Sequence, residues 1–154
     1  MHIISLWSDP PPSISALLVH YNPETAVPIP LFDCTVPASF PSPAEDYLDK
    51  TLDLNDLVIQ HPASTFFVKV EGNSMIDAGI HSGDVLVIDR ALEPEDNRVV
   101  VAILNGGFTV KRIKKCGGHL FLMPENTDHT PIAVDPESDF QVWGIVTYVI
   151  HPVR

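Results

Sequence analysis

The feature that most constrains the fold is a series of short apolar segments, each ended by a turn signal, that fills the chain beyond His61-Pro62. Glycine, proline, asparagine and aspartate separate the segments, and Asn105-Gly106 is a strong signal for a two-residue hairpin turn. The segments expected to form strands are 65–70, 85–89, 98–104, 107–113, 119–123 and 140–150. Short strands at this spacing predict a mainly β fold, either a compact barrel or folded-over sheets.

The first 38 residues differ from this pattern in composition. They hold seven of the 15 prolines and neither lysine nor arginine. A helix-turn-helix domain needs regular helices and cationic contacts to phosphate, so this segment is not expected to bind DNA. Its apolar patches predict an extended arm that docks on a folded surface, and the alternative is a flexible terminus.

Two short helices are expected between the arm and the strands. Ser42, Pro43 and Glu45 fit the cap, the first position and the third position of a capping box, which predicts a helix running to about Lys50. Asp53 is expected to cap a second short helix whose apolar side chains share one face.

Composition narrows the classes of function. A net charge of −11 argues against broad contact with phosphate backbones, although an acidic protein can still join DNA machinery through protein contacts. Cys34 and Cys116 form no disulfide framework, and the seven histidines show no ligand spacing, so neither a metal site nor a cofactor is expected. No apolar run is long enough to span a membrane, and residues 1–7 lack the positive charge of a secretory signal, which predicts a cytoplasmic protein.

Ser74 and Lys111 are the candidate catalytic residues. Ser74 follows the turn-forming pair Gly72-Asn73 directly after a strand, which predicts a hydroxyl at the mouth of a sheet. Strand alternation places Thr109, Lys111 and Ile113 on one face, opposite to Phe108 and Val110. A lysine acts as a base at pH 7 only if burial lowers its pKa from ~10.4 by ~3 units. Taken singly, such residues are more often a turn serine and a solvated lysine.

The order of these segments resembles the self-cleaving serine-lysine peptidase domain shared by LexA-type repressors and UmuD-type mutagenesis proteins. The similarity rests on Gly72-Asn73-Ser74-Met75, the segment 80–89 and the segment 108–112, while 40–47 and 53–62 are more similar to the UmuD branch. The resemblance implies a compact LexA/UmuD-like β-fold. It also implies Ser74 as nucleophile, Lys111 as general base, and the backbone N–H groups of Ser74 and Met75 as oxyanion donors.

The resemblance also implies a cleavage site. Members are cut at a small-residue bond just before a sequence of the type found at Phe40-Pro41-Ser42-Pro43, which places the cut between Ala38 and Ser39. Ser39 departs from the family, which usually has glycine there. The chain would then comprise an arm over 1–38 that is removed on cleavage, a helical linker over 39–64 and a β-rich peptidase and dimerisation core over 65–154.

The partners that the resemblance implies are a second copy of the chain, a RecA filament on single-stranded DNA that stimulates cleavage, and a UmuC-type translesion polymerase. The setting would be the SOS response, without sequence-specific DNA binding by this chain.

Alternatives remain open. The main one is a polymerase-binding scaffold on the same fold that no longer cleaves itself, and another is a repressor-type SOS regulator lacking its DNA-binding domain. Both Ser74 and Lys111 are retained, which argues against the scaffold, whereas Ser39 leaves it open. A histidine-based serine hydrolase is disfavoured because 72–76 lacks the last glycine of a nucleophile elbow. A relative of signal peptidase would need a membrane anchor, which is not found.

Overall fold

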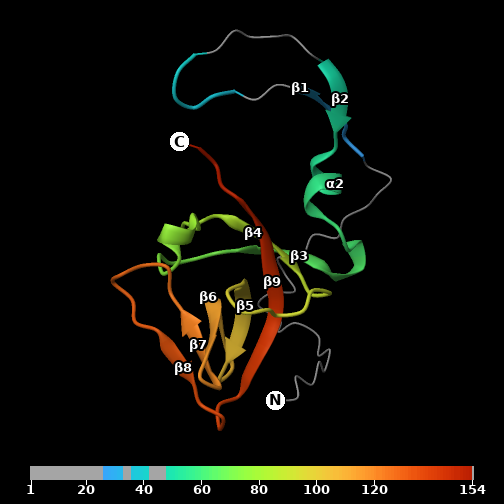
Figure 1. Cartoon of the computed structure of the whole chain (residues 1–154). Helices are drawn as coiled ribbons and strands as arrows, with labels where there is room; N and C mark the ends of the chain where they lie inside the picture. Colours follow the sequence, from blue (N-terminus) through green and yellow to red (C-terminus); the bar gives the residue numbers. More distant parts are fainter. Residues whose placement is uncertain (1–25, 33–35, 42–47, 154) are drawn as a thin grey trace. The chain divides into compact units, whose positions relative to one another are not determined.

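The computed structural model describes residues 26–32, 36–41 and 48–153. The chain divides into two compact units, a smaller one over 21–60 and a larger one that contains all of 61–154 (Figure 1). Among the described residues, no helix is long and apolar enough to cross a membrane.

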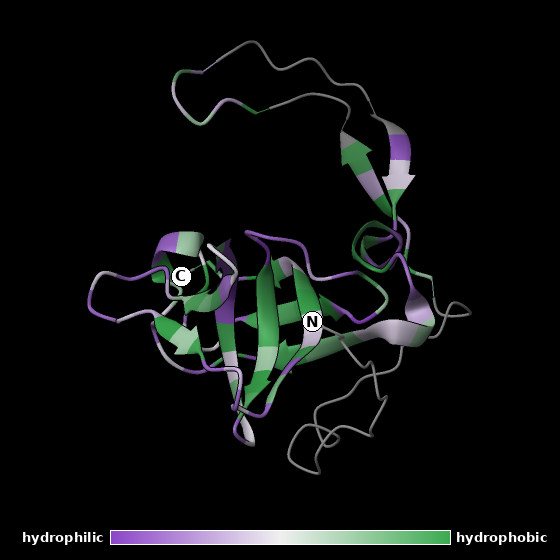
Figure 2. Ribbon diagram, turned by 60° about the horizontal axis from the view of Figure 1, so that its bottom comes forward, coloured by the Kyte–Doolittle hydropathy of each residue, from purple (hydrophilic) through white to green (hydrophobic). Residues whose placement is uncertain are grey.

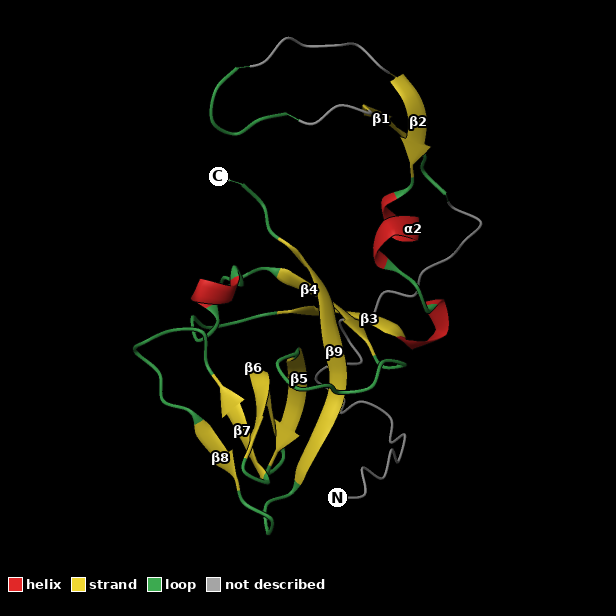
Figure 3. Ribbon diagram, in the orientation of Figure 1, coloured by secondary structure: helices red, strands yellow, loops and turns green. Residues whose placement is uncertain are grey.

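The larger unit is built on one antiparallel sheet of seven strands in the order β3-β4-β9-β5-β6-β7-β8 (Figure 3). The strands are β3 (Thr65–Lys69), β4 (Val85–Asp89), β5 (Val99–Leu104), β6 (Gly107–Cys116), β7 (His119–Met123), β8 (Ile132–Val134) and β9 (Phe140–Ile150). Two short 3₁₀ helices, η2 (Pro62–Ser64) and η3 (Ile76–Ala78), precede β3 and β4. The long strand β9 pairs with both β4 and β5 and so joins the two halves of the sheet.

Two tight turns fix the register of the central hairpins. Asn105 and Gly106 have φ angles of 49° and 81°, and Leu104 pairs with Gly107 across the turn. Both turn residues therefore have the left-handed backbone that a two-residue hairpin of the right twist needs. The turn between β6 and β7 is made by Gly117-Gly118 in the same way.

A bulge in β9 lets the sheet bury apolar side chains on both faces. Consecutive residues of β5 pair with Gly144 and Val142, so Trp143 is an extra residue between them. Trp143 therefore packs into one core cluster, whereas Ile145 belongs to a second. Figure 2 shows the result: hydrophobic residues follow the strands of this sheet, and the loops between them are largely hydrophilic.

The smaller unit contains a two-stranded hairpin and one helical turn. β1 (Ile29–Phe32) pairs antiparallel with β2 (Leu48–Leu52), and α2 (Leu54–Val58) follows. Asp53 links α2 to the segment before β1. Its carboxylate accepts hydrogen bonds from the backbone N–H groups of Asn55 and Val27, both at 2.8 Å. The predicted cap at Asp53 is therefore confirmed.

The predicted mainly β fold is confirmed, and the six predicted strands appear in order as β3 to β7 and β9. The helix predicted to reach Lys50 is wrong at its end, since 48–52 is a strand held by the backbone ladder to β1. Because β1 lies well before 48–52 in the sequence, its pairing with this segment overrides the local preference for helix. The capping box at 42–45 lies outside the described residues. β1, β2 and β8 were not predicted.

Candidate active site

Ser74 lies in the turn that follows β3. Hydrogen bonds from a loop much later in the sequence hold this turn in place. Gly72 has a φ of +101°, a left-handed conformation that allows the chain to leave the strand sharply. The carbonyl oxygen of Ser74 accepts a hydrogen bond of 2.8 Å from the backbone N–H of Glu125. The buried side chain of Asn126 donates to the carbonyl oxygen of Asn73 at 2.9 Å. The backbone of Ser74 is thus held in one position.

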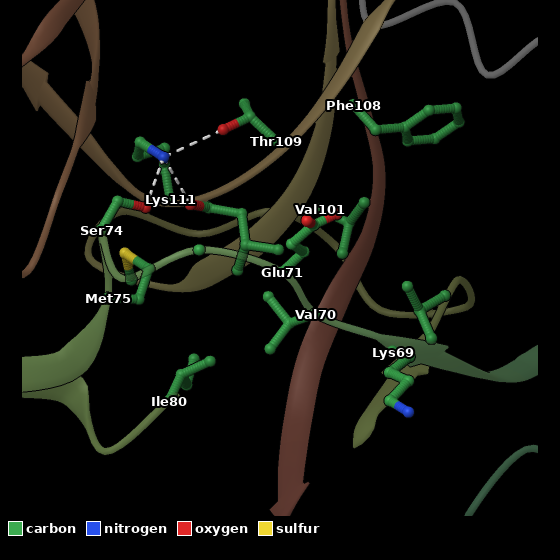
Figure 4. Close-up of a pocket in the computed structure, with 13 residues that line it drawn as sticks. Lys69, Val70, Glu71, Ser74, Met75, Ile80, Val101, Phe108, Thr109 and Lys111 are labelled. Atoms are coloured by element: carbon green, nitrogen blue, oxygen red, sulfur yellow. Dashed lines mark hydrogen bonds between the residues drawn. The ribbon is translucent and has the colours of Figure 1, made fainter. Parts of the chain in front are cut away.

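Lys111 reaches Ser74 from β6 (Figure 4). Its Nζ lies 2.8 Å from Ser74 Oγ, 3.0 Å from Thr109 Oγ1 and 3.0 Å from the carbonyl oxygen of Val110. Only 8% of the residue is exposed. The predicted alternation is confirmed, because Phe108 and Val110 pack against the first core cluster while Lys111 and Thr109 meet on the opposite face.

The surroundings of Lys111 lower the cost of a neutral amine. Burial lowers the pKa of Lys111 below the ordinary value for lysine because the charged form loses its hydration. A neutral amine has two N–H donors and one lone pair. The carbonyl oxygen of Val110 and Thr109 Oγ1 can accept the two N–H bonds, which leaves the lone pair for the hydroxyl proton of Ser74. This arrangement can raise the nucleophilicity of the serine oxygen.

A pocket of about 350 Å³ opens beside the two side chains. One wall is the end of β3 with the turn that follows it, and the other is formed by 108–111 of β6. Met75, Ile80 and Val101 supply apolar surface, and the charged Nζ of Lys69 points away from Lys111 (Figure 4). The pocket therefore gives an extended peptide backbone with small side chains access to Ser74 Oγ.

The backbone N–H groups of Ser74 and Met75 are the candidate oxyanion donors. Among the described residues, neither N–H group donates a hydrogen bond to a backbone carbonyl oxygen. They lie in the same turn as the hydroxyl of Ser74.

Ala38 and Ser39 belong to the smaller unit, whereas Ser74 and Lys111 belong to the larger one. Ala38 and Ser39 lie in the connection between β1 and β2. The described residues of this connection, 36–41, are all exposed. Phe40, directly after the predicted cut, is 83% exposed. A bond in such a segment is accessible to a protease site.

Two residues that support the site were not assigned a role by the sequence. Thr109 was placed on the correct face by strand alternation, but its bond to Lys111 needed side-chain positions. Asn126 bonds to a residue 53 positions earlier, and nothing near it in the sequence signals this.

Comparison with known proteins agrees with the geometry. Residues 30–147 match the family described as Peptidase S24-like. The chain is 44% identical to Protein SamA of Salmonella typhimurium over 125 residues, which cover 81% of this chain and 86% of SamA. It is 40% identical to Protein MucA of Escherichia coli over 132 residues, covering 81% of this chain and 87% of MucA.

A LexA repressor, from Dechloromonas aromatica, is 44% identical over 90 residues, which cover 58% of this chain and 45% of the repressor. The match to the family model extends over most of the chain and includes every strand from β3 to β8. The chain therefore belongs to the Peptidase S24-like family of serine peptidases, as a member of its UmuD type.

Proposed function

We propose that the chain is a serine endopeptidase that cuts its own backbone between Ala38 and Ser39, with Ser74 as nucleophile and Lys111 as general base. The observation that carries the proposal is the 2.8 Å contact between Lys111 Nζ and Ser74 Oγ at a buried site beside a pocket. A serine and a buried lysine at this distance are suited to act as a nucleophile and its base.

The reaction is acyl transfer. The lone pair of Lys111 takes the Ser74 proton while Ser74 Oγ attacks the carbonyl carbon of Ala38. The N–H groups of Ser74 and Met75 donate to the oxyanion, which is worth about 3 kcal/mol per well-placed donor. Lys111, now an ammonium, gives its proton to the leaving nitrogen of Ser39. Water then hydrolyses the ester, which releases residues 1–38 and leaves a core that begins at Ser39.

Thr109 and Val110 prepare the base for this step. Their oxygens hold the two N–H bonds of neutral Lys111, and they stabilise the ammonium that forms when the proton arrives. The proton therefore passes from Ser74 to Lys111 and then to the nitrogen of Ser39.

Delivery of Ala38 to Ser74 controls the rate in this proposal. The cut lies in the exposed connection of the smaller unit, so cleavage depends on how often that connection occupies the pocket. A RecA filament on single-stranded DNA would favour the docked state, and the shortened chain, as a homodimer, would join a UmuC-type translesion polymerase in the SOS response. The UmuD-type membership supports this setting.

The test is intact-mass analysis of purified protein after incubation at alkaline pH, and separately with RecA, ATP and single-stranded DNA. Wild type is expected to give a new species beginning at Ser39, and Ser74→Ala and Lys111→Ala are expected to stay whole. Lys69→Ala is the matched control, because Lys69 lines the same pocket with its amine directed away.

If wild type stays whole under both conditions, the self-cleavage proposal fails. The non-cleaving scaffold then becomes the better account, and Ser39 in the place of the family's glycine is the residue to examine first.

A further inference from the structure

A second cluster of polar side chains lies where strands β4 and β9 end together. Val85 pairs with Ile150 in the β4–β9 ladder, so the next residues outward, Asp84 and His151, face each other. His151 Nδ1 lies 2.6 Å from Asp84 Oδ1. His81 approaches the other carboxylate oxygen, with its Nδ1 3.7 Å from Asp84 Oδ2. The fold thus brings together two histidines that are far apart in the sequence, a pairing that a search for short ligand spacings does not detect.

The exposure of the three side chains suits an ion that enters from solvent. The side chain of Asp84 is 2% exposed, whereas those of His81 and His151 are about half exposed. The two imidazole rings lie 4.8 Å apart between their centres. One ligand atom from each of the three residues lies within 4.8 Å of the other two. A pocket lined by 82–84 and 151–153 gives access to the carboxylate.

We propose that His81, Asp84 and His151 form a binding site for a divalent transition-metal ion of the zinc class. Two imidazoles and one carboxylate are a ligand set that Zn²⁺ prefers, and three protein ligands leave a fourth position for water. Bonds of about 2.1 Å require ligand atoms ~3.4 Å apart in a tetrahedral site. Rotation of the two half-exposed imidazoles can bring the ligand atoms to this spacing, because it widens the 2.6 Å contact between His151 and Asp84 and closes the longer separations.

Asp84 is ready to act as the anionic ligand. Both carboxylate oxygens of Asp84 are held in place, since Oδ1 faces His151 Nδ1 at 2.6 Å. The backbone N–H of His81 donates to Asp84 Oδ2 at 2.7 Å and fixes the carboxylate plane. The carboxylate is therefore oriented toward the two imidazoles.

A bound ion would link the last residues of β9 to the turn before β4. That turn is joined to Ser74 by only a few residues that include η3, so the metal would tie the C-terminal strand to the segment that carries the nucleophile. The site itself is separate from the pocket beside Ser74, since the two pockets share no lining residue.

The test uses tag-free full-length protein carrying Cys34→Ser and Cys116→Ser, so that thiols do not bind the probe. Equilibrium dialysis against Zn²⁺ is followed by metal analysis, and Co²⁺ is titrated with its visible spectrum recorded. We expect one Zn²⁺ per chain and a four-coordinate Co²⁺ spectrum. His81→Gln and His151→Gln should each weaken binding by about tenfold or more.

The matched control is His61→Gln. His61 also bonds to a buried aspartate, Asp89, and its side chain is 46% exposed. Among the described residues, however, no third side chain of a metal-binding type joins this pair to form a group of three. His61 therefore offers the same hydrogen-bonded imidazole without a second histidine beside it, and the Zn²⁺ affinity of His61→Gln should equal that of the parent protein.

Circular dichroism of every variant checks that the fold is kept. Loss of stoichiometric Zn²⁺ in both His81→Gln and His151→Gln, with His61→Gln unchanged, supports the site. If the parent protein retains no Zn²⁺, or if either histidine variant binds as tightly as the parent, the proposal is overturned.

Discussion

The two units of the chain treat their apolar side chains differently. In the larger unit Leu122 and Leu86 are fully buried, and Lys111 in the same sheet is 8% exposed. In the smaller unit Ile29 is 58% exposed and Leu54 is 55% exposed, although both belong to regular elements. Burial therefore holds the catalytic candidates of the larger unit in place, while Ile29 and Leu31, described residues of the strand before Ala38 and Ser39, are largely exposed.

This difference suits a protein that is both protease and substrate. The base and nucleophile must be positioned closely, and packing in a seven-stranded sheet supplies that. In the proposed reaction the bond between Ala38 and Ser39 has to reach Ser74, and an exposed segment can change its conformation at low cost. Rigidity and accessibility are thus assigned to different parts of one chain.

The largest effect is expected from a substitution that changes the chemistry of Lys111, the proposed base, with little change in its size. Lys111→Arg places a guanidinium that stays protonated, so it cannot take the Ser74 proton. Self-cleavage at alkaline pH should slow by about a thousandfold or more. The time course of the product mass measures this, and Lys69→Arg in the same pocket should stay within about twofold of wild type. Retained cleavage in Lys111→Arg would refute the role of Lys111.

A paired truncation compares the two units directly. Leu122→Ala removes a fully buried side chain and should lower the free energy of unfolding by about 2–5 kcal/mol. Leu54→Ala removes a side chain that is 55% exposed and should cost about 0.5 kcal/mol. Urea unfolding followed by circular dichroism measures both. Equal losses would contradict the difference in burial between these two leucines.

The smallest effect is expected at the loop that holds the serine turn. Asn126→Ala removes the hydrogen bond to the carbonyl oxygen of Asn73, worth about 1–1.5 kcal/mol, and a bond from the backbone N–H of Asp128, and should slow self-cleavage roughly tenfold. Thr127→Ala, an exposed neighbour, is the control and should have no effect. A cleavage rate in Asn126→Ala equal to that of wild type would mean that the turn keeps its position without this contact.

Local pattern predicted most of the larger unit and little of the smaller one. Strands such as 85–89 and 119–123 have apolar runs between strong turn signals, and both were predicted with the observed bounds. β1 and β2 lack such signals and form because they pair with each other, which local preference does not encode. Ser74 and Lys111 were named from sequence, but the supporting contact from Asn126 depends on a loop folded back over the turn.

The measurement that tests the central claim most directly is the pH dependence of unstimulated self-cleavage, followed by intact mass. Since burial lowers the pKa of Lys111, the active neutral amine should form below the ordinary lysine value of ~10.4. The rate should therefore rise with pH and level off before pH ~10.4, while circular dichroism shows the protein folded. A rate that does not depend on pH, or one that is still rising above pH ~10.4, would contradict a buried lysine base.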